Sequence, residues 1–393
     1  AADALVAAFN PQLATWGHSP FPVEVEQHLI RAIGERFGYE PGRLEGTFTS
    51  GGAEANHTAL LTAITRAFPD VGRRGLMALR SQPVFYVSPG GHDSFHKAAR
   101  MVGLGSESMR EVAVDAGFRM RADDLAERIR QDRRDGLAPF LVVATAGSTA
   151  AGVVDPLDDI AAVAEEEGLW FHVDAAWGGA AVLLPELRPR LGGIGRASSI
   201  TFDAHKWLSV PMGAGLYLTR VPGILERTFR VSAGYMPREG AGALDPYASS
   251  LQWSRRFIGL KLFLSLAVAG WDGYEAAVRH HVAMGDRLRD GLRAAGWTVV
   301  NDTPLPLVCF VDSGPEGRSA AFLEGVAADV VASGEAWISL VGLGEGNQAL
   351  RACVTNYRTG SQDVDALLGL LERARERVAG AGAPAALSGS APG

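Results

Sequence analysis

The chain has 393 residues, of which 47% are hydrophobic and 21% are charged, a composition typical of a globular protein large enough for two domains. Its formal net charge of −7 provides no basic surface, so we expect no nucleic-acid partner. No charge-free apolar stretch is long enough to cross a membrane, and no basic signal region opens the chain. Both cysteines lie in apolar runs. These observations together predict a cytoplasmic protein with reduced thiols and no membrane partner.

Strand-like and helix-like segments alternate along the first half of the chain. Apolar residues recur at helical spacing over residues 22–38, with Pro at the start and Gly at the end, which predicts a helix. Short β-rich apolar runs and helices then alternate. The predicted strands are 46–49, 84–87, 140–145, 169–173, 199–202 and 215–218, and the predicted helices are 53–68, one from residue 92, and one after Pro156 through Glu167. This alternation predicts an α/β fold with a mostly parallel central sheet covered by helices.

The pattern changes in the last third of the chain. A long helical pattern covers residues 256–295, and shorter strands and helices after it indicate a smaller α+β domain. We therefore predict a large domain over residues 1–260, a small C-terminal domain over 261–378, and a disordered tail over 379–393, where Ala, Gly, Pro and Ser dominate. Because the chain begins at Ala1, already with a helical pattern, we also expect that an N-terminal segment is missing or processed.

Two predicted strands end in residues that suit pyridoxal phosphate chemistry. One ends at Asp174, and the next leads into Asp203, Ala204, His205 and Lys206. A Lys amine can form the Schiff base, and a carboxylate facing the pyridine nitrogen keeps the ring protonated as an electron sink. The small residue Ala176 leaves room for a flat ring. The alternative is an Asp that caps a turn and an unrelated surface Lys, but the order and spacing of the pair favour cofactor binding.

Two further motifs follow predicted strands. Gly51, Gly52 and Ala53 open a helix, whose backbone N–H groups and dipole suit a phosphate dianion, although such a turn is often structural only. His92 begins another helix, where its ring could stack on a cofactor or simply lie in solvent. Catalytic groups in such sheets lie at the carboxyl ends of the strands. Four residues follow or end predicted strands in this way: His92, Thr145, Asp174 and Lys206.

On these motifs the chain resembles the pyridoxal-phosphate-dependent amino acid decarboxylases of the aromatic-L-amino-acid, glutamate and histidine decarboxylase group. The resemblance covers roughly residues 20 to 260. Its matching blocks are 48–56, the segment around His92, 144–149 with Asp155-Pro156, 172–179, 203–207 and 255–257, with a further likeness at 350–353. It implies an aspartate-aminotransferase-like fold, pyridoxal 5'-phosphate as cofactor, no metal, and a homodimer with shared active sites.

The resemblance also implies roles for individual residues. Lys206 would form the Schiff base, Asp174 would pair with the ring nitrogen, and His92 would stack on the ring. The other residues expected around the cofactor or its phosphate are Gly51, Gly52, Ala53, Thr145, Ser148, Ala176, Asp203 and His205. Ala53 departs from the family pattern, in which a Thr or Ser usually supplies a hydroxyl.

A loop tyrosine is the expected proton donor of the family reaction. The resemblance places Tyr235 in that role, in a Gly-rich stretch suited to a lid, with Tyr247 as a second candidate. We therefore predict decarboxylation of an L-amino acid to the corresponding amine, through a Schiff base, with an aromatic or another neutral amino acid as substrate. The alternatives are oxidative deamination to an aldehyde, transamination or aldol cleavage on the same fold, and a cofactor-binding homologue without catalysis.

Overall fold

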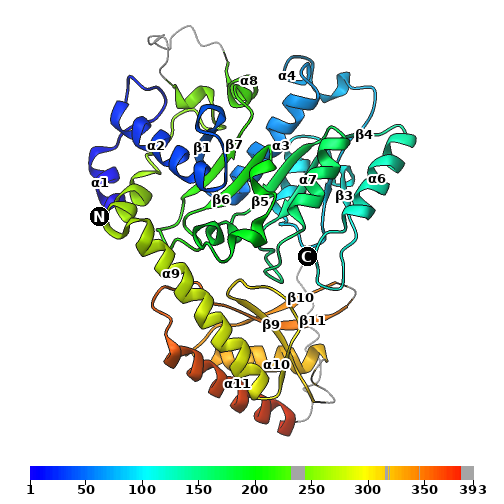
Figure 1. Cartoon of the computed structure of the whole chain (residues 1–393), viewed down its shortest axis with the longest axis vertical. Coiled ribbons are helices and arrows are strands. Elements are labelled where there is room, and N and C mark those ends of the chain that lie inside the picture. Colours follow the sequence, from blue (N-terminus) through cyan, green and yellow to red (C-terminus); the bar gives the residue numbers. More distant parts are fainter. Residues whose placement is uncertain (232–243, 315–316, 318, 345, 382–393) are drawn as a thin grey trace, which may run out of the picture. The chain divides into compact units, whose positions relative to one another are not determined.

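The computed structural model shows two compact units (Figure 1). It describes residues 1–231, 244–314, 317, 319–344 and 346–381. The first unit contains Ala1–Thr149 and Val154–Val278, and the second contains Ala150–Val153 and the chain from Arg279 onward. The division falls inside the long helix α9 (Leu260–Ala294). The sequence-based boundary at residue 260 stays a prediction.

The first unit is built on a seven-stranded sheet that is parallel except for one strand. β7 runs antiparallel to both of its neighbours, β1 and β6, and every other neighbouring pair of this sheet is parallel. The predicted mostly parallel sheet is therefore confirmed. In spatial order the strands are β1 (Glu45–Thr49), β7 (Gly215–Thr219), β6 (Ser199–Asp203), β5 (Trp170–Asp174), β4 (Ala138–Thr145), β2 (Pro83–Val87) and β3 (Met109–Glu111).

Both faces of this sheet are covered. Successive side chains of a strand point to opposite faces, yet all five residues of β5 and of β6 are buried. The helix α3 (Gly52–Ala67) packs against β4, β5, β6 and β7, while α6 (Ala122–Arg134) and α7 (Leu157–Glu166) pack against β4. The remaining α-helices described in this unit are α1 (Ala2–Phe9), α2 (Pro20–Arg36), α4 (Val71–Arg74), α5 (Ser94–Met101) and α8 (Ile224–Phe229).

The structure differs from the predicted elements at a few places. α5 begins at Ser94 instead of His92, because the His92 ring accepts a hydrogen bond from the Ser94 backbone N–H and so caps the helix from outside (3.1 Å). The predicted helix over 256–295 corresponds to α9, but its backbone leaves the helical conformation at Gly270 (φ 62°, ψ 179°). The sequence did not predict α6, because this strongly charged helix buries only two apolar side chains, Leu125 and Ile129.

The second unit contains a four-stranded antiparallel sheet. In spatial order the strands are β10 (Ser339–Gly342), β11 (Gln348–Cys353), β9 (Leu307–Asp312) and β8 (Trp297–Val299). The helices α10 (Ala320–Ala332) and α11 (Ser361–Ala381) pack against each other. α11 thus continues into the segment predicted to be disordered, and residues 382–393 lie outside the described part. Within the described ranges, no helix is both long and apolar enough to cross a membrane.

Candidate active site

A cavity of about 270 Å³ lies at the carboxyl ends of the strands of the first unit. Segments that follow β1, β2, β4, β5 and β6 all contribute to it, as expected for an open parallel sheet. The residues that line it are Ser50, Gly51, Gly52, Ala53, Glu54, Asn56, His92, Thr145, Gly147, Thr149, Asp174, Ala176, Trp177, Asp203, His205, Lys206 and Met212.

The cavity therefore brings together nearly all of the site residues expected from the sequence. Ser148 is the exception among the described residues: it is buried beside the cavity but does not line it. Tyr235, the expected proton donor, lies outside the described residues. Tyr247 is described and half-buried, and its ring centroid lies 5.0 Å from that of Trp253.

Lys206 is held by the carboxylate of Asp203, the residue that ends β6. Its Nζ lies 3.1 Å from Asp203 Oδ2, and about a third of the Lys206 side chain is exposed. The same oxygen accepts a hydrogen bond from the Gly52 backbone N–H (3.0 Å), and His205 Nε2 lies 3.7 Å away. The buried carboxylate of Asp203 thus fixes both the Lys206 amine and the first turn of α3, where the glycine-rich motif lies.

Asp174 ends β5 and is almost fully buried, with 5% of its surface exposed. Its Oδ1 accepts a hydrogen bond from the Ala176 backbone N–H (3.1 Å), and its Oδ2 accepts one from Asn56 Nδ2 (2.8 Å). Among the described residues, no Lys, Arg or His forms an ion pair with this carboxylate. A buried carboxylate without a cationic partner favours a ligand that brings positive charge to the cavity.

The glycines of the cavity wall are places where a side chain would not fit. A Cβ on Gly52 would lie 2.9 Å from Asp203 Oδ2, and a Cβ on Gly147 would lie 2.9 Å from the Cα of Gly178. Gly147 also has φ +92°, which L side chains rarely adopt. Glycine at these positions lets the α3 N-terminus approach Asp203 and lets the turn after β4 approach Gly178.

The two histidines of the cavity each have one nitrogen engaged by the backbone. The Ala214 N–H donates to His205 Nδ1 (3.1 Å), and the Ser94 N–H donates to His92 Nδ1 (3.1 Å). In the neutral imidazole the proton of each ring is therefore on Nε2. Both rings can donate a hydrogen bond from that nitrogen.

Three residues that matter for this geometry were quoted in sequence motifs but given no role. Asn56, one helical turn after Gly52, contacts Asp174 directly. Asp155 accepts hydrogen bonds from the backbone N–H groups of Thr145 (2.7 Å) and Met120 (2.8 Å), so it fixes the end of β4, and burial raises its pKa to about 6. Trp177 stacks on Trp207, with ring centroids 5.3 Å apart and planes 13° from parallel. The position of Asn56 one turn after the glycine pair puts it on the same side of the helix as Gly52, but the sequence does not show which residues it contacts.

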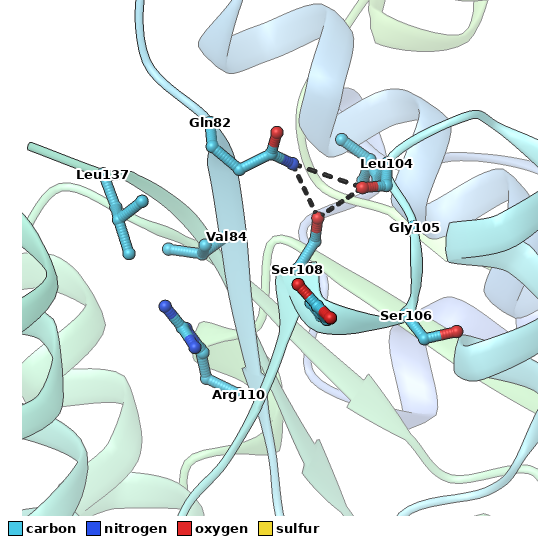
Figure 2. Close-up of a pocket in the computed structure, with 9 residues that line it drawn as sticks. Gln82, Val84, Leu104, Gly105, Ser106, Ser108, Arg110 and Leu137 are labelled. Atoms are coloured by element: carbon cyan, nitrogen blue, oxygen red, sulfur yellow. Dashed lines mark hydrogen bonds between the residues drawn. The ribbon is translucent and has the colours of Figure 1, made fainter.

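A second cavity, of about 540 Å³, is larger but lies away from these groups (Figure 2). It is formed near the amino ends of β2 and β4, where Gln82 donates hydrogen bonds to Leu104 O (3.2 Å) and Ser108 Oγ (2.8 Å). Its one basic side chain, Arg110, lies 3.5 Å from Asp132. The described residues that line this cavity include no Lys amine and no buried unpaired carboxylate, so it does not offer the chemistry of the first cavity.

Comparison with known proteins identifies the family. Residues 1–312 match the pyridoxal-dependent decarboxylase conserved domain. The chain belongs to this family. It is 33% identical over 315 residues to the mouse acidic amino acid decarboxylase GADL1, covering 79% of this chain and 57% of that protein. It is 34% identical over 311 residues to mouse cysteine sulfinic acid decarboxylase, covering 78% and 62%.

A solved structure agrees with the family assignment. The crystal structure of mouse CSAD superposes with a TM-score of 0.89 at 30% identity, covering 95% of this chain and 80% of that chain. The predicted aspartate-aminotransferase-like α/β fold is therefore confirmed. The chain nevertheless spans less than two thirds of the length of the two curated mouse relatives.

The cofactor of this family member is pyridoxal 5'-phosphate, and the cavity fits it. The fit rests on a Lys amine, an unpaired buried carboxylate and an open helix N-terminus around one space. Two buried polar atoms of cavity residues also have no hydrogen-bond partner among the described residues, Trp177 Nε1 and Asp203 Oδ1. Both are available to a ligand or to water.

Proposed function

We propose that this protein catalyses the pyridoxal-phosphate-dependent decarboxylation of an L-amino acid to the corresponding amine. One observation carries the proposal: the Lys206 amine and the unpaired Asp174 carboxylate line a single cavity in a chain of the decarboxylase family. The bound cofactor supplies an electron sink for the charge left on the substrate carbon when carbon dioxide departs.

Asp174 sets the strength of that sink. Its negative charge keeps the ring nitrogen protonated, and because the carboxylate is buried, its interaction with the ring is not screened by water. The hydrogen bonds from Asn56 and Ala176 hold the carboxylate in place before the cofactor binds. The sequence-based role of Asp174 is kept in this proposal.

Lys206 provides the amine that attaches the cofactor. Asp203, at 3.1 Å, orients this amine and offers it a counter-charge when the substrate amine takes its place. Gly51 and Gly52 at the start of α3 are assigned to the phosphate, with Thr145, Ser148 and His205 as further donors. His92 is assigned to the face of the ring, and Ala53 supplies no hydroxyl.

A tyrosine is proposed to return a proton to the substrate carbon. The first candidate is Tyr235, on the family resemblance, and the second is Tyr247, whose backbone N–H donates to Ala14 O (3.0 Å). The two are separated by single Tyr→Phe variants, because a phenol is needed for proton donation but not for packing.

The substrate proposed now differs from the aromatic or neutral amino acid expected from the sequence. The relatives reported above are named for acidic and sulfinic amino acids, which favours an L-amino acid with a short, charged side chain. The test is a panel of the twenty amino acids plus cysteine sulfinic acid, with carbon dioxide release measured and products identified by mass spectrometry. Amine and carbon dioxide in equal amounts support decarboxylation, whereas a keto acid without carbon dioxide contradicts it.

We also propose a homodimer with shared active sites and a cytoplasmic location. The dimer rests on the family resemblance. The location rests on two free thiols, Cys309, which is buried, and Cys353, which is half-buried, and desolvation raises the pKa of both.

A further inference from the structure

A hydrogen-bonded network lies behind Asp174 and joins α3 to β5, to β6 and to the start of α5. Asn56 is its centre: Nδ2 donates to Asp174 Oδ2 (2.8 Å) and to Ser94 Oγ (2.9 Å). On the other side of the amide, Asn56 Oδ1 accepts from Thr201 Oγ1 (2.7 Å) and faces His172 Nε2 (3.3 Å). Asn56, Thr201 and His172 are each at most 1% exposed, so water does not replace these partners.

The protons of this network have one consistent arrangement. An ionised Asp174 can only accept, so the amide must turn its NH₂ group toward the carboxylate and its oxygen toward Thr201 and His172. Thr201 has a single proton, which it donates to Asn56 Oδ1, so His172 Nε2 must carry its own proton to face that oxygen. His172 Nδ1 then accepts from Ser199 Oγ (2.8 Å).

His172 contributes a hydrogen bond but no charge. It is fully buried, and desolvation lowers its pKa to about 4, so its ring is neutral at neutral pH. Its edge also packs against Phe95, with ring centroids 5.9 Å apart. The network therefore delivers two oriented donors to one end of the Asn56 amide without placing a competing cation beside Asp174.

We propose that Asn56 is a positioning residue that holds the Asp174 carboxylate aimed into the cavity, with Thr201 and His172 fixing the direction of the Asn56 amide. This inference rests on the proposed function, because it assumes that Asp174 faces the ring nitrogen of the cofactor. The physical reason is that an amide N–H donor stabilises the charged form of a buried carboxylate. A protonated carboxyl would instead favour the amide turned over, with the amide oxygen toward the carboxyl O–H. Thr201 and His172 oppose that turn, because both would then face an NH₂ group.

The test uses the holoenzyme with pyridoxal 5'-phosphate carrying ¹⁵N in the ring. The ¹⁵N chemical shift reports whether the ring nitrogen is protonated, and a titration of the apoenzyme gives the cofactor dissociation constant. We expect Asn56→Leu to shift the ring nitrogen toward its unprotonated form. The dissociation constant should rise by about tenfold to a hundredfold, as for the loss of a hydrogen bond to a charged group.

Three further variants sharpen the test. Thr201→Val leaves Asn56 in place but removes one donor to its oxygen, so we expect a smaller change of the same sign. Thr58→Val is the matched control: it removes a buried hydroxyl of the same helix, which donates to Glu54 O (2.9 Å), and should leave the ¹⁵N shift unchanged. If Asn56→Leu does not fold, Asn56→Ser carries the same expectation.

The outcomes separate this inference from the proposed function. An Asn56→Leu enzyme with the parent's ¹⁵N shift and dissociation constant overturns the inference if Asp174→Asn changes both quantities, and the proposed function then stands. If Asp174→Asn changes neither, Asp174 does not face the ring nitrogen, and both fail. A shift of equal size in Thr58→Val would show that loss of packing is the cause and would also overturn the inference.

Discussion

Replacing Asp174 by Asn is the most informative single change, because it keeps the shape of the side chain and removes its charge. The carboxylate is 5% exposed and ends a fully buried strand, so its pairing with a protonated ring nitrogen would be a buried ion pair. Breaking such a pair by removing one partner costs about 3–5 kcal/mol. At about 1.4 kcal/mol per factor of ten, this predicts a decrease in kcat of roughly a hundredfold to several thousandfold.

The assay compares single-turnover decarboxylation in the parent and the Asp174→Asn enzyme, each saturated with cofactor. Saturation matters because the variant also binds the cofactor less tightly, and the rate must report the sink strength alone. Any aldehyde or ketone formed from the substrate in place of the amine is quantified in the same samples. A rate within about threefold of the parent, which is under 1 kcal/mol, would refute the argument that a buried charge controls the reaction.

The remaining predictions use other parts of the site. Borohydride reduction and peptide mapping should place the pyridoxyl group on Lys206, and Lys206→Ala should lose the visible absorption of the bound cofactor; a label elsewhere contradicts the assignment. Tyr235→Phe should keep cofactor binding but lower the amine yield and raise aldehyde, and if Tyr247→Phe has this effect instead, Tyr247 is the donor. Ultracentrifugation should show a dimer at concentrations where the enzyme is active, and an active monomer would exclude shared sites. The folded-state pKa of Asp155, about 6 against a usual 3.8, predicts a contribution to stability that is present below pH 3.8 and lost as the pH rises through 6. The loss is about 3 kcal/mol, and Asp155→Asn should remove this pH dependence in thermal unfolding measured against the parent.

The sequence predicted the functional residues at the strand ends better than the buried residues that hold them in place. Asp174 and Lys206 could be found because each follows a short apolar run, and the end of such a run in an alternating α/β pattern points to one edge of the sheet. Asn56 could not be given a role in the same way, because its partners come from β5, from β6 and from the start of α5, which are far apart in the chain. Only packing brings them together.

The second unit shows the same limit at the level of whole elements. The apolar runs 307–311 and 350–355 of the sequence predict strands, and these correspond to β9 and β11. By contrast, β8 has three residues, of which only Trp297 is buried, and such a short segment has no period to detect. Trp297 packs its ring edge to face with Phe310, at 5.3 Å between centroids. The strand is therefore defined by a contact with its neighbour and not by its own pattern.

Two buried carboxylates of the first unit show how partners decide between a structural and a catalytic role. Both carboxylate oxygens of Asp155 accept hydrogen bonds from backbone N–H groups, those of Thr145 and Met120. Its pKa is nevertheless raised, because two neutral donors do not offset the loss of hydration on burial. Asp174 also accepts two hydrogen bonds, but one of them comes from the side-chain amide of Asn56. The oxygen of that amide accepts a hydrogen bond from Thr201. Backbone donors can only fix a loop, whereas a side-chain donor can be oriented by further residues. This difference makes Asp174 adjustable by its surroundings, and it is the reason that we expect substitutions of Asn56 to change the chemistry of the cofactor while substitutions of Asp155 change mainly the stability of the fold.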